Sequence, residues 1–237
     1  MSELFNRLLA RRTETDGGRP LITYYAEPGG IRTELSATSF SNWVSKTAGL
    51  LTDEILIEPG QTVRLDLLRT APAHWVTLVW VAATWRVGCA VTMTSDADAA
   101  VEVVGPEHVQ DEPGAIERVA CSLHPFGLGF RETLPPGTID YGVEVRAQPD
   151  SFTGPWPADA DPTWIDASQT MNQQDIITAA SAGPAQRTMI DPADSAGPWA
   201  TVTDCLITPV LTGGSVVVTV GTDTDRRAQI AEDERVD

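Results

Sequence analysis

The chain has 237 residues, enough to bury a sizeable core, and its hydrophobic content of 42% is ordinary for a globular protein. A formal net charge of −17 makes nucleic acids and anionic membrane surfaces poor partners, because like charges repel. No apolar run approaches the roughly 20 residues that span a bilayer, and the N-terminus is not expected to act as a secretory signal. Three cysteines give no disulfide framework. We therefore expect a cytoplasmic protein.

The first part of the chain predicts a hairpin followed by an amphipathic helix. Leu21–Ala26 and Ile31–Leu35 have the composition of its two strands, and a Pro-Gly-Gly turn joins them. From Thr38 to Leu51, apolar side chains recur at the spacing of one helix face. Lys46, the single lysine of the chain, lies off that face and is expected to be a solvated surface charge.

A strand–helix–strand unit follows and indicates the fold class. Thr62–Leu67 is a predicted strand, Ala73–Val87 is apolar nearly all round and predicts a buried helix, and Cys89–Met93 predicts a short buried strand. Such a unit is a parallel crossover. We therefore expect an α/β fold, layered, with a mainly parallel sheet flanked by helices, and one domain over residues 1–237.

The middle of the chain is less regular. Ala100–Val104 and Val119–Leu123 are predicted strands, and the alternation along Tyr141–Ala147 predicts a half-buried strand. An irregular loop or linker is expected around residues 149–170, where Pro and Gly interrupt every pattern. Asn172–Ala180 predicts a helix.

Near the end, Asp204–Gly221 predicts an apolar helix, a Gly-Gly stop, a buried strand and the start of another helix. Gly213-Gly214-Ser215 differs from a phosphate loop, which follows a strand and opens a helix. Here the glycines follow a helix and open a strand. We therefore interpret them as a helix stop.

These elements, in this order, resemble the N-terminal region of adenylate-forming enzymes, the acyl-CoA synthetase and AMP-binding superfamily. The resemblance rests on Gly30–Leu35, the helix after Ser39-Phe40, the turn and strand of Glu58–Val63, the buried helix that ends at Gly88, and Leu206–Gly221. It implies the fold of the first subdomain of those enzymes.

A second resemblance is narrower. Ser122–Phe130, Leu134–Gly137, Asp140-Tyr141 and Glu144–Arg146 resemble a small family of short, uncharacterised bacterial proteins that look like a truncated AMP-binding domain. This resemblance spans essentially the whole chain. It implies no established activity.

The resemblance to adenylating enzymes also shows which parts to look for. Such enzymes hold the ATP triphosphate in a Ser/Thr/Gly-rich loop that ends in Pro-Lys, and they use a lysine from a C-terminal lid domain. The region where the loop should fall, Asp150–Ala180, has no such motif, and its acidic residues Asp150, Asp159, Asp161 and Asp166 would repel a triphosphate. The adenine- and ribose-binding motifs would lie beyond the last residue. We therefore expect no enzyme and no cofactor; the alternative cofactor is ATP or AMP with Mg²⁺.

One cluster of polar residues is the candidate ligand site. Asp140, Glu144 and Arg146 place a cation between carboxylates, with Glu144 and Arg146 on one face of the predicted strand. The alternative is a solvated pair on a sheet face. For a small polar ligand, we expect His124 and Arg131 to join these three residues.

A Cys-His couple is the remaining chemical candidate. Cys121 and His124 are three residues apart, and a Cys-His couple can form an activated nucleophile. A buried thiol in a strand beside a turn is the preferred explanation, because a reactive thiol needs a positive setting that this acidic chain rarely offers. His74 and His108 are expected at the surface, and no residues have metal-ligand spacing.

The sequence thus predicts a catalytically degenerate AMP-binding-like protein that binds a small ligand or a protein partner, which includes a second copy of itself. The alternative is an adenylate-forming, acyl-CoA synthetase-like enzyme that completes its site with another chain. A cysteine-dependent enzyme using Cys121 is a third class. Descent at the level of the fold does not decide among them.

Overall fold

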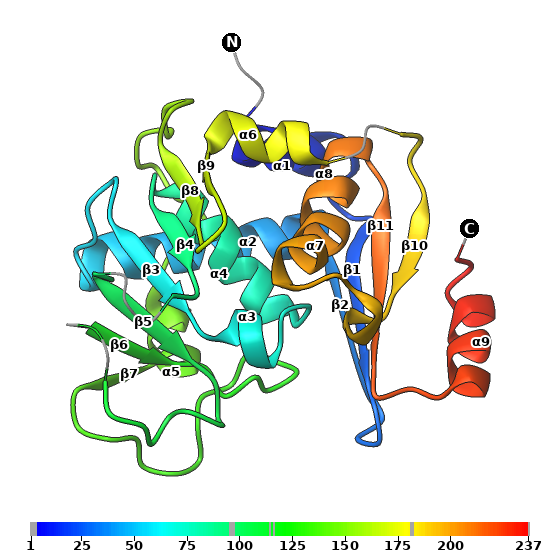
Figure 1. Cartoon of the computed structure of the whole chain (residues 1–237). Coiled ribbons are helices and arrows are strands. Elements are labelled where there is room, and N and C mark those ends of the chain that lie inside the picture. The colour runs from blue at the N-terminus through cyan, green and yellow to red at the C-terminus, as the bar shows by residue number, and fades with distance from the viewer. Residues whose placement is uncertain (1–3, 95–97, 114, 116, 181–182, 237) are drawn as a thin grey trace.

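A computed structural model of the chain describes residues 4–94, 98–113, 115, 117–180 and 183–236. Within these residues the strands form two sheets, a small one of four strands and a large one of seven. The long helices run between the two sheets, so that sheet, helices and sheet follow one another as layers (Figure 1). This arrangement confirms the layered α/β class that the sequence predicts.

The small sheet joins the two ends of the chain. Its strands lie in the order β10 (Arg187–Ile190), β11 (Ser215–Val220), β1 (Pro20–Ala26) and β2 (Ile31–Ser36). The β1–β2 pair is the predicted antiparallel hairpin, whereas β1 and β10 both run parallel to β11. Strands from opposite ends of the sequence therefore lie side by side.

The large sheet is parallel except at one edge. Its strands, in spatial order, are β7 (Thr138–Asp140), β6 (Glu117–Ala120), β5 (Val101–Val104), β3 (Thr62–Leu65), β4 (Ala90–Thr92), β8 (Pro162–Ile165) and β9 (Thr170–Asn172). Only the β8–β9 pairing of this sheet is antiparallel within the described residues. The parallel β3–β4 pair confirms the predicted crossover unit.

Helix α4 (Trp75–Arg86) crosses from β3 to β4 and forms the centre of the core. Every residue of α4 is buried, in agreement with its apolar sequence. Helix α1 (Phe5–Asp16) and helix α2 (Ala37–Gly49), which continues as a π-helical turn over Leu50–Glu54, pack beside it. One apolar cluster includes residues of both sheets and of these helices, and so the two sheets share a core.

The other helices are short or lie outside this layer. They are α3 (Leu67–Thr70), α5 (Tyr141–Glu144), α6 (Gln173–Ala179), α7 (Pro198–Val202), α8 (Thr208–Thr212), α9 (Thr224–Asp233), the 3-10 turns Val145–Ala147 and Pro192–Asp194, and a π-helical turn, Thr203–Ile207. Helix α9 lies on the outer face of the small sheet (Figure 1). None of the described helices has both the length and the apolar character needed to cross a membrane.

The structure corrects the prediction of a strand at Tyr141–Ala147, which instead forms α5 and a 3-10 turn. Asp140 starts the helix, since its Oδ1 accepts a hydrogen bond from the backbone N–H of Gly142 at 3.0 Å. Tyr141 and Val145 are both buried, at helical spacing i and i+4. The alternating sequence is compatible with both a strand and a helical turn, and the burial of Tyr141 and Val145 favours the helical turn.

Two further expectations about single residues are wrong. Lys46 is not a freely solvated charge: its ammonium donates to the backbone carbonyl of Gln148 and lies 3.0 Å from the Asp150 carboxylate. His74 does not lie at the surface as expected. It caps the start of α4, and its side chain is only 5% exposed. Its ring lies against Tyr24 and Trp75, which exclude water from it.

Candidate functional site

His124 and Arg131 share one cavity, which lies on the loop after β6. This cavity has a volume of about 320 Å³, and the loop itself supplies most of its wall. The Nδ1 atom of His124 accepts a hydrogen bond from the backbone N–H of Phe126 at 3.1 Å, which fixes the ring in the loop. The structure thus brings together two of the five predicted ligand-binding residues.

Asp140 and Glu144 line a different cavity of about 580 Å³, and Glu132 lines both. The Asp140 carboxylate accepts hydrogen bonds from the backbone N–H groups of Phe130 and Gly142. It therefore holds the loop and the start of α5 together. Arg146 is exposed and lines neither cavity. The predicted pairing of Glu144 and Arg146 on a strand face is wrong, because this segment is helical.

Exposed apolar side chains lie beside these two cavities. Phe126 is 72% exposed, Val143 56% and Leu128 39%. The backbone of Leu128 packs so closely against Gly142 that a Cβ at Gly142 would lie 2.3 Å from the carbonyl carbon of Leu128. This contact brings the loop and α5 together. The result is a small group of exposed apolar side chains, an apolar patch, next to the acidic cavity.

Cys121 has the environment of a core residue. It is 1% exposed, and its sulfur accepts a hydrogen bond from Trp80 Nε1 at 3.2 Å. Burial raises the pKa of the Cys121 thiol far above its usual range, which opposes thiolate formation. Within the described part of the chain, no hydrogen bond joins Cys121 to His124. The geometry for an activated nucleophile is therefore missing there.

The turn between β8 and β9 lies in the segment where the resemblance places a triphosphate-binding loop. At this turn the Asp166 carboxylate accepts hydrogen bonds from the backbone N–H groups of Ser168 and Gln169, at 2.7 and 2.9 Å. It also accepts from the Ser168 hydroxyl and from Trp164 Nε1. Burial alone would raise the pKa of Asp166, but these hydrogen bonds outweigh it and lower the pKa to about 2. A carboxylate of this protein therefore occupies the N–H donors of the turn.

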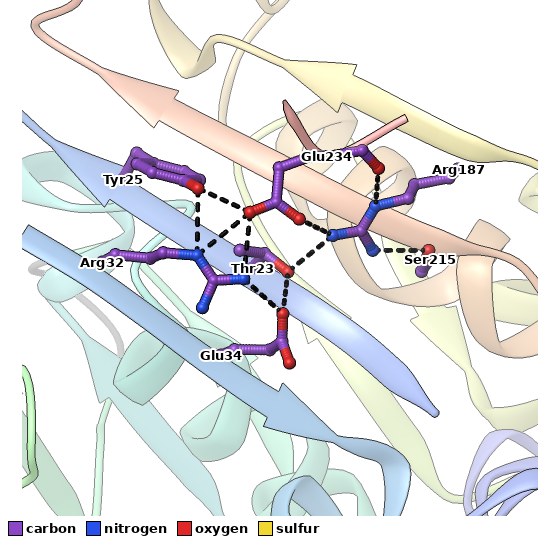
Figure 2. Close-up of polar contacts among 7 residues, drawn as sticks. All are labelled: Thr23, Tyr25, Arg32, Glu34, Arg187, Ser215 and Glu234. Carbon is purple, nitrogen blue, oxygen red and sulfur yellow. Dashed lines mark hydrogen bonds and ion pairs between the residues drawn. The ribbon is translucent and has the colours of Figure 1, made fainter. Parts of the chain in front are cut away.

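An extended polar network that no sequence pattern predicts lies on the outer face of the small sheet (Figure 2). At its centre is Glu234, just after α9. One carboxylate oxygen accepts from Tyr25 on β1 at 2.5 Å and from Arg32 on β2 at 3.0 Å. The other oxygen lies 2.5 Å from the guanidinium of Arg187 on β10. A single carboxylate thus ties the end of α9 to three strands.

The remaining contacts of the network fix its arginines. Arg187 also donates to Ser215 Oγ and to Thr23 Oγ1, both at 3.0 Å, and Arg32 pairs with Glu34 at 2.6 Å. Although burial alone would raise the pKa of Glu234, the hydrogen bonds from Tyr25, Arg187 and Arg32 lower it. No local motif carries this network, because its members come from both ends of the sequence. Only the pairing of β1 with β11 could have indicated it.

No group of three or more His, Cys, Asp or Glu side chains among the described residues is arranged to hold a metal ion.

Three solved structures share this fold at low sequence identity. An acyl-CoA synthetase from Brucella canis matches 97% of the chain with a TM-score of 0.73 and 15% identity, over 46% of its own length. The N-terminal domain of FACL13 from Mycobacterium tuberculosis matches 99% of the chain, with a TM-score of 0.73, 12% identity and 62% of its own length covered. The anthranilate CoA ligase AuaEII, in complex with anthranoyl-AMP, matches 98% of the chain, with a TM-score of 0.71, 16% identity and 47% of its length covered.

The fold is therefore that of the N-terminal domain of adenylate-forming enzymes, and the chain spans between about half and two thirds of the length of these solved proteins. No protein-family model matches the chain. A protein of Mycobacterium tuberculosis described as a TIGR03089 family protein is 30% identical over 214 residues, which cover 86% of this chain and 84% of that protein. The chain belongs to the TIGR03089 family.

Proposed function

We propose that the protein is a catalytically degenerate member of the adenylate-forming fold, which binds a small ligand or a protein partner and does not adenylate a substrate. The observation that carries the proposal is the Asp166 carboxylate at the turn between β8 and β9. Backbone N–H groups in such a loop would have to bind phosphate oxygens. Here an acidic side chain is bound to them instead, and its charge repels an incoming phosphate.

The surroundings of the turn support the same conclusion. A triphosphate needs a nearby cation, and the single lysine of the chain, Lys46, is paired with Asp150 and Gln148. Asp159, Asp161 and Asp175 add further negative charge to this segment. Negative charge in this segment opposes the approach of a triphosphate, because like charges repel.

Binding remains the activity that this geometry permits. The cavities at His124 and at Asp140 are open to small molecules, and the apolar patch of Phe126, Leu128 and Val143 gives a protein partner a place to dock. The three cysteines are free and buried, which agrees with a cytoplasmic location, where thiols stay reduced.

Isothermal titration calorimetry tests the proposal directly. Mg-ATP, and then a non-hydrolysable acyl-adenylate analogue, are titrated into the protein and into the variant Asp166→Gly, which frees the N–H donors. We expect the wild type to bind no nucleotide at this turn at millimolar ligand. Micromolar binding there, about −8 kcal/mol, would overturn the proposal and favour an enzyme that completes its site with another chain.

A further inference from the structure

A cavity of about 550 Å³ opens where three strands of the small sheet begin, beside the network centred on Glu234. Pro20, Arg187 and Ser215, the first residues of β1, β10 and β11, all line it. This volume is typical of sites for small metabolites. The cavity lies at the amino-terminal ends of these strands. Ligands of parallel sheets usually bind at the other edge, beyond the carboxyl-terminal ends of the strands.

The wall of this cavity is rich in arginine, in a protein of strongly negative net charge. Its guanidinium groups come from four places in the chain: Arg12, Arg19, Arg187 and Arg235. They represent four of the sixteen basic residues of a chain whose net charge is −17. A local concentration of arginine can attract an anion that the rest of this surface repels.

Arg12 forms the buried back of the cavity. It is only 8% exposed, and its guanidinium is held by Asp16 at 3.0 Å and by the carbonyl oxygen of Gly214 at 3.4 Å. Its Nε atom is buried without a hydrogen-bond partner among the described residues. A buried donor without a partner costs free energy that an acceptor nearby would recover.

Arg19 and Arg235 stand at the rim. Both are exposed, and the structure records no side-chain partner for either within the residues that it describes. Two of the three carboxylates of the wall, by contrast, are paired with arginines. Glu34 pairs with Arg32 and Glu234 pairs with Arg187, while Asp233 is exposed to solvent. The cations facing the cavity therefore outnumber the carboxylates that are still available to neutralise them.

We infer that this cavity binds a small metabolite with a phosphate or carboxylate group, which the guanidiniums of Arg12, Arg19 and Arg235 bind. Planar guanidinium groups form paired hydrogen bonds with either kind of anion. Glycine also keeps the space beside Arg12 free of a side chain, since a Cβ on Gly213 would lie 3.6 Å from Nη1 of Arg12. This inference rests on the proposed function in naming a site for its small ligand.

Calorimetry at constant ionic strength tests the site, with inorganic phosphate and citrate as the two anion probes and glycerol as an uncharged one. The test variant is Arg19→Gln combined with Arg235→Gln, since both residues are exposed and need not affect folding. Its matched control is Arg11→Gln, an exposed arginine of α1 that does not line the cavity. Thermal unfolding without ligand checks that all the proteins are folded.

We expect saturable binding of at least one anion, weakened about tenfold or more in the double variant and unchanged in the control. The better of the two probes identifies phosphate or carboxylate as the preferred group. The inference is overturned if neither anion binds at millimolar concentration, if the double variant binds as tightly as the wild type, or if the control loses as much affinity. Mg-ATP binding that disappears in the double variant belongs to this cavity, whereas Mg-ATP binding that survives it overturns the proposed function instead.

Discussion

The hydroxyl of Tyr25 lies 2.5 Å from the carboxylate of Glu234, although 209 residues separate them in the sequence. On the same face of the small sheet, Tyr25 packs with Val217 and with Ile230 of α9. The residues on either side of Tyr25 along β1, Tyr24 and Ala26, contribute to the main core on the opposite face of the sheet. One strand thus joins the core on one face to α9 on the other.

We expect Glu234→Ala to release the end of α9. The change leaves the half-buried Arg187 guanidinium without its carboxylate, and it should lower the free energy of unfolding by about 2 kcal/mol. Urea unfolding measures this loss, and hydrogen exchange should show faster exchange in α9. The control is Glu232→Ala, an exposed carboxylate of the same helix. Equal stability of the two variants would contradict the role of Glu234.

Asp166→Asn should lower the free energy of unfolding by about 1 kcal/mol at neutral pH. A neutral amide accepts weaker hydrogen bonds from the N–H groups of Ser168 and Gln169 than a carboxylate does. The folded-state pKa of Asp166 is depressed to about 2. Its stabilisation is therefore present above the unfolded pKa of about 4 and is lost as the pH falls toward 2. Unfolding curves of the two proteins should converge over that window. A constant difference down to pH 2 would rule out the charged carboxylate as the cause.

His74 should make the protein less stable in mild acid. Burial lowers the pKa of His74 to about 4, from the usual 6.5, against a smaller opposite effect of its hydrogen bond with the backbone of Leu123. Between those two pH values the unfolded chain binds a proton that the folded chain does not, and so stability falls as the pH falls. The loss should reach about 3 kcal/mol near pH 4.

The variant His74→Asn tests this origin, since asparagine can still cap α4 by accepting the backbone N–H of Val76. Its stability at pH 7 is expected to be lower, because the packed ring is lost. Between pH 6.5 and 4, however, its urea midpoint should change much less than that of the wild type. A slope equal to that of the wild type would assign the acid sensitivity to other groups.

The three thiols should resist alkylation while the protein is folded. Burial raises the pKa of Cys121 and of Cys205 and raises that of Cys89 to about 12, so that little thiolate forms near neutral pH. Mass spectrometry after iodoacetamide treatment should find all three unmodified in buffer and all three modified in urea. Rapid labelling of Cys121 alone would revive the cysteine-dependent enzyme.

Arg86 should anchor the irregular segment that follows α5. Its guanidinium donates to the carbonyl oxygens of Gly154 and Pro155 and lies 4.2 Å from the ring centroid of Trp156. We expect Arg86→Lys to lower stability by about 1 kcal/mol, because an ammonium cannot form the same forked contacts. Limited proteolysis should then cut the segment around residues 150–160 faster. An unchanged cleavage rate would show that other contacts hold it.

Most of the fold could be predicted from local patterns. The β1–β2 hairpin and helix α2 have sequence patterns that reflect their burial, and α4 is apolar nearly all round because all of it is buried. Gly213 ends α8 with a positive φ, as a helix stop does. The division into two sheets could not be predicted, because it depends on which strands pair across the chain. The pattern of Tyr141–Ala147 also misled, since alternation over seven residues suits a strand and a helical turn alike.

The site was less predictable than the fold. The sequence analysis placed Asp140, Glu144 and Arg146 in one candidate ligand site together with His124 and Arg131. In the structure His124 and Arg131 line one cavity, Asp140 and Glu144 line a neighbouring one, and Arg146 lines neither. The arginine cavity was missed altogether. Its arginines extend from Arg12 to Arg235, near opposite ends of the sequence, and no local motif links them.

The parallel pairing of β1 with β11 has a consequence for synthesis on the ribosome. Ile22 pairs with Val216, so β1 gains its second neighbour only after the chain has been translated as far as β11. Until then the nascent hairpin presents one unpaired strand edge and an uncovered apolar face that includes Leu21 and Ile22. Contacts of such long range form slowly, and the exposed apolar strand of the growing chain is prone to aggregate until β11 pairs with it.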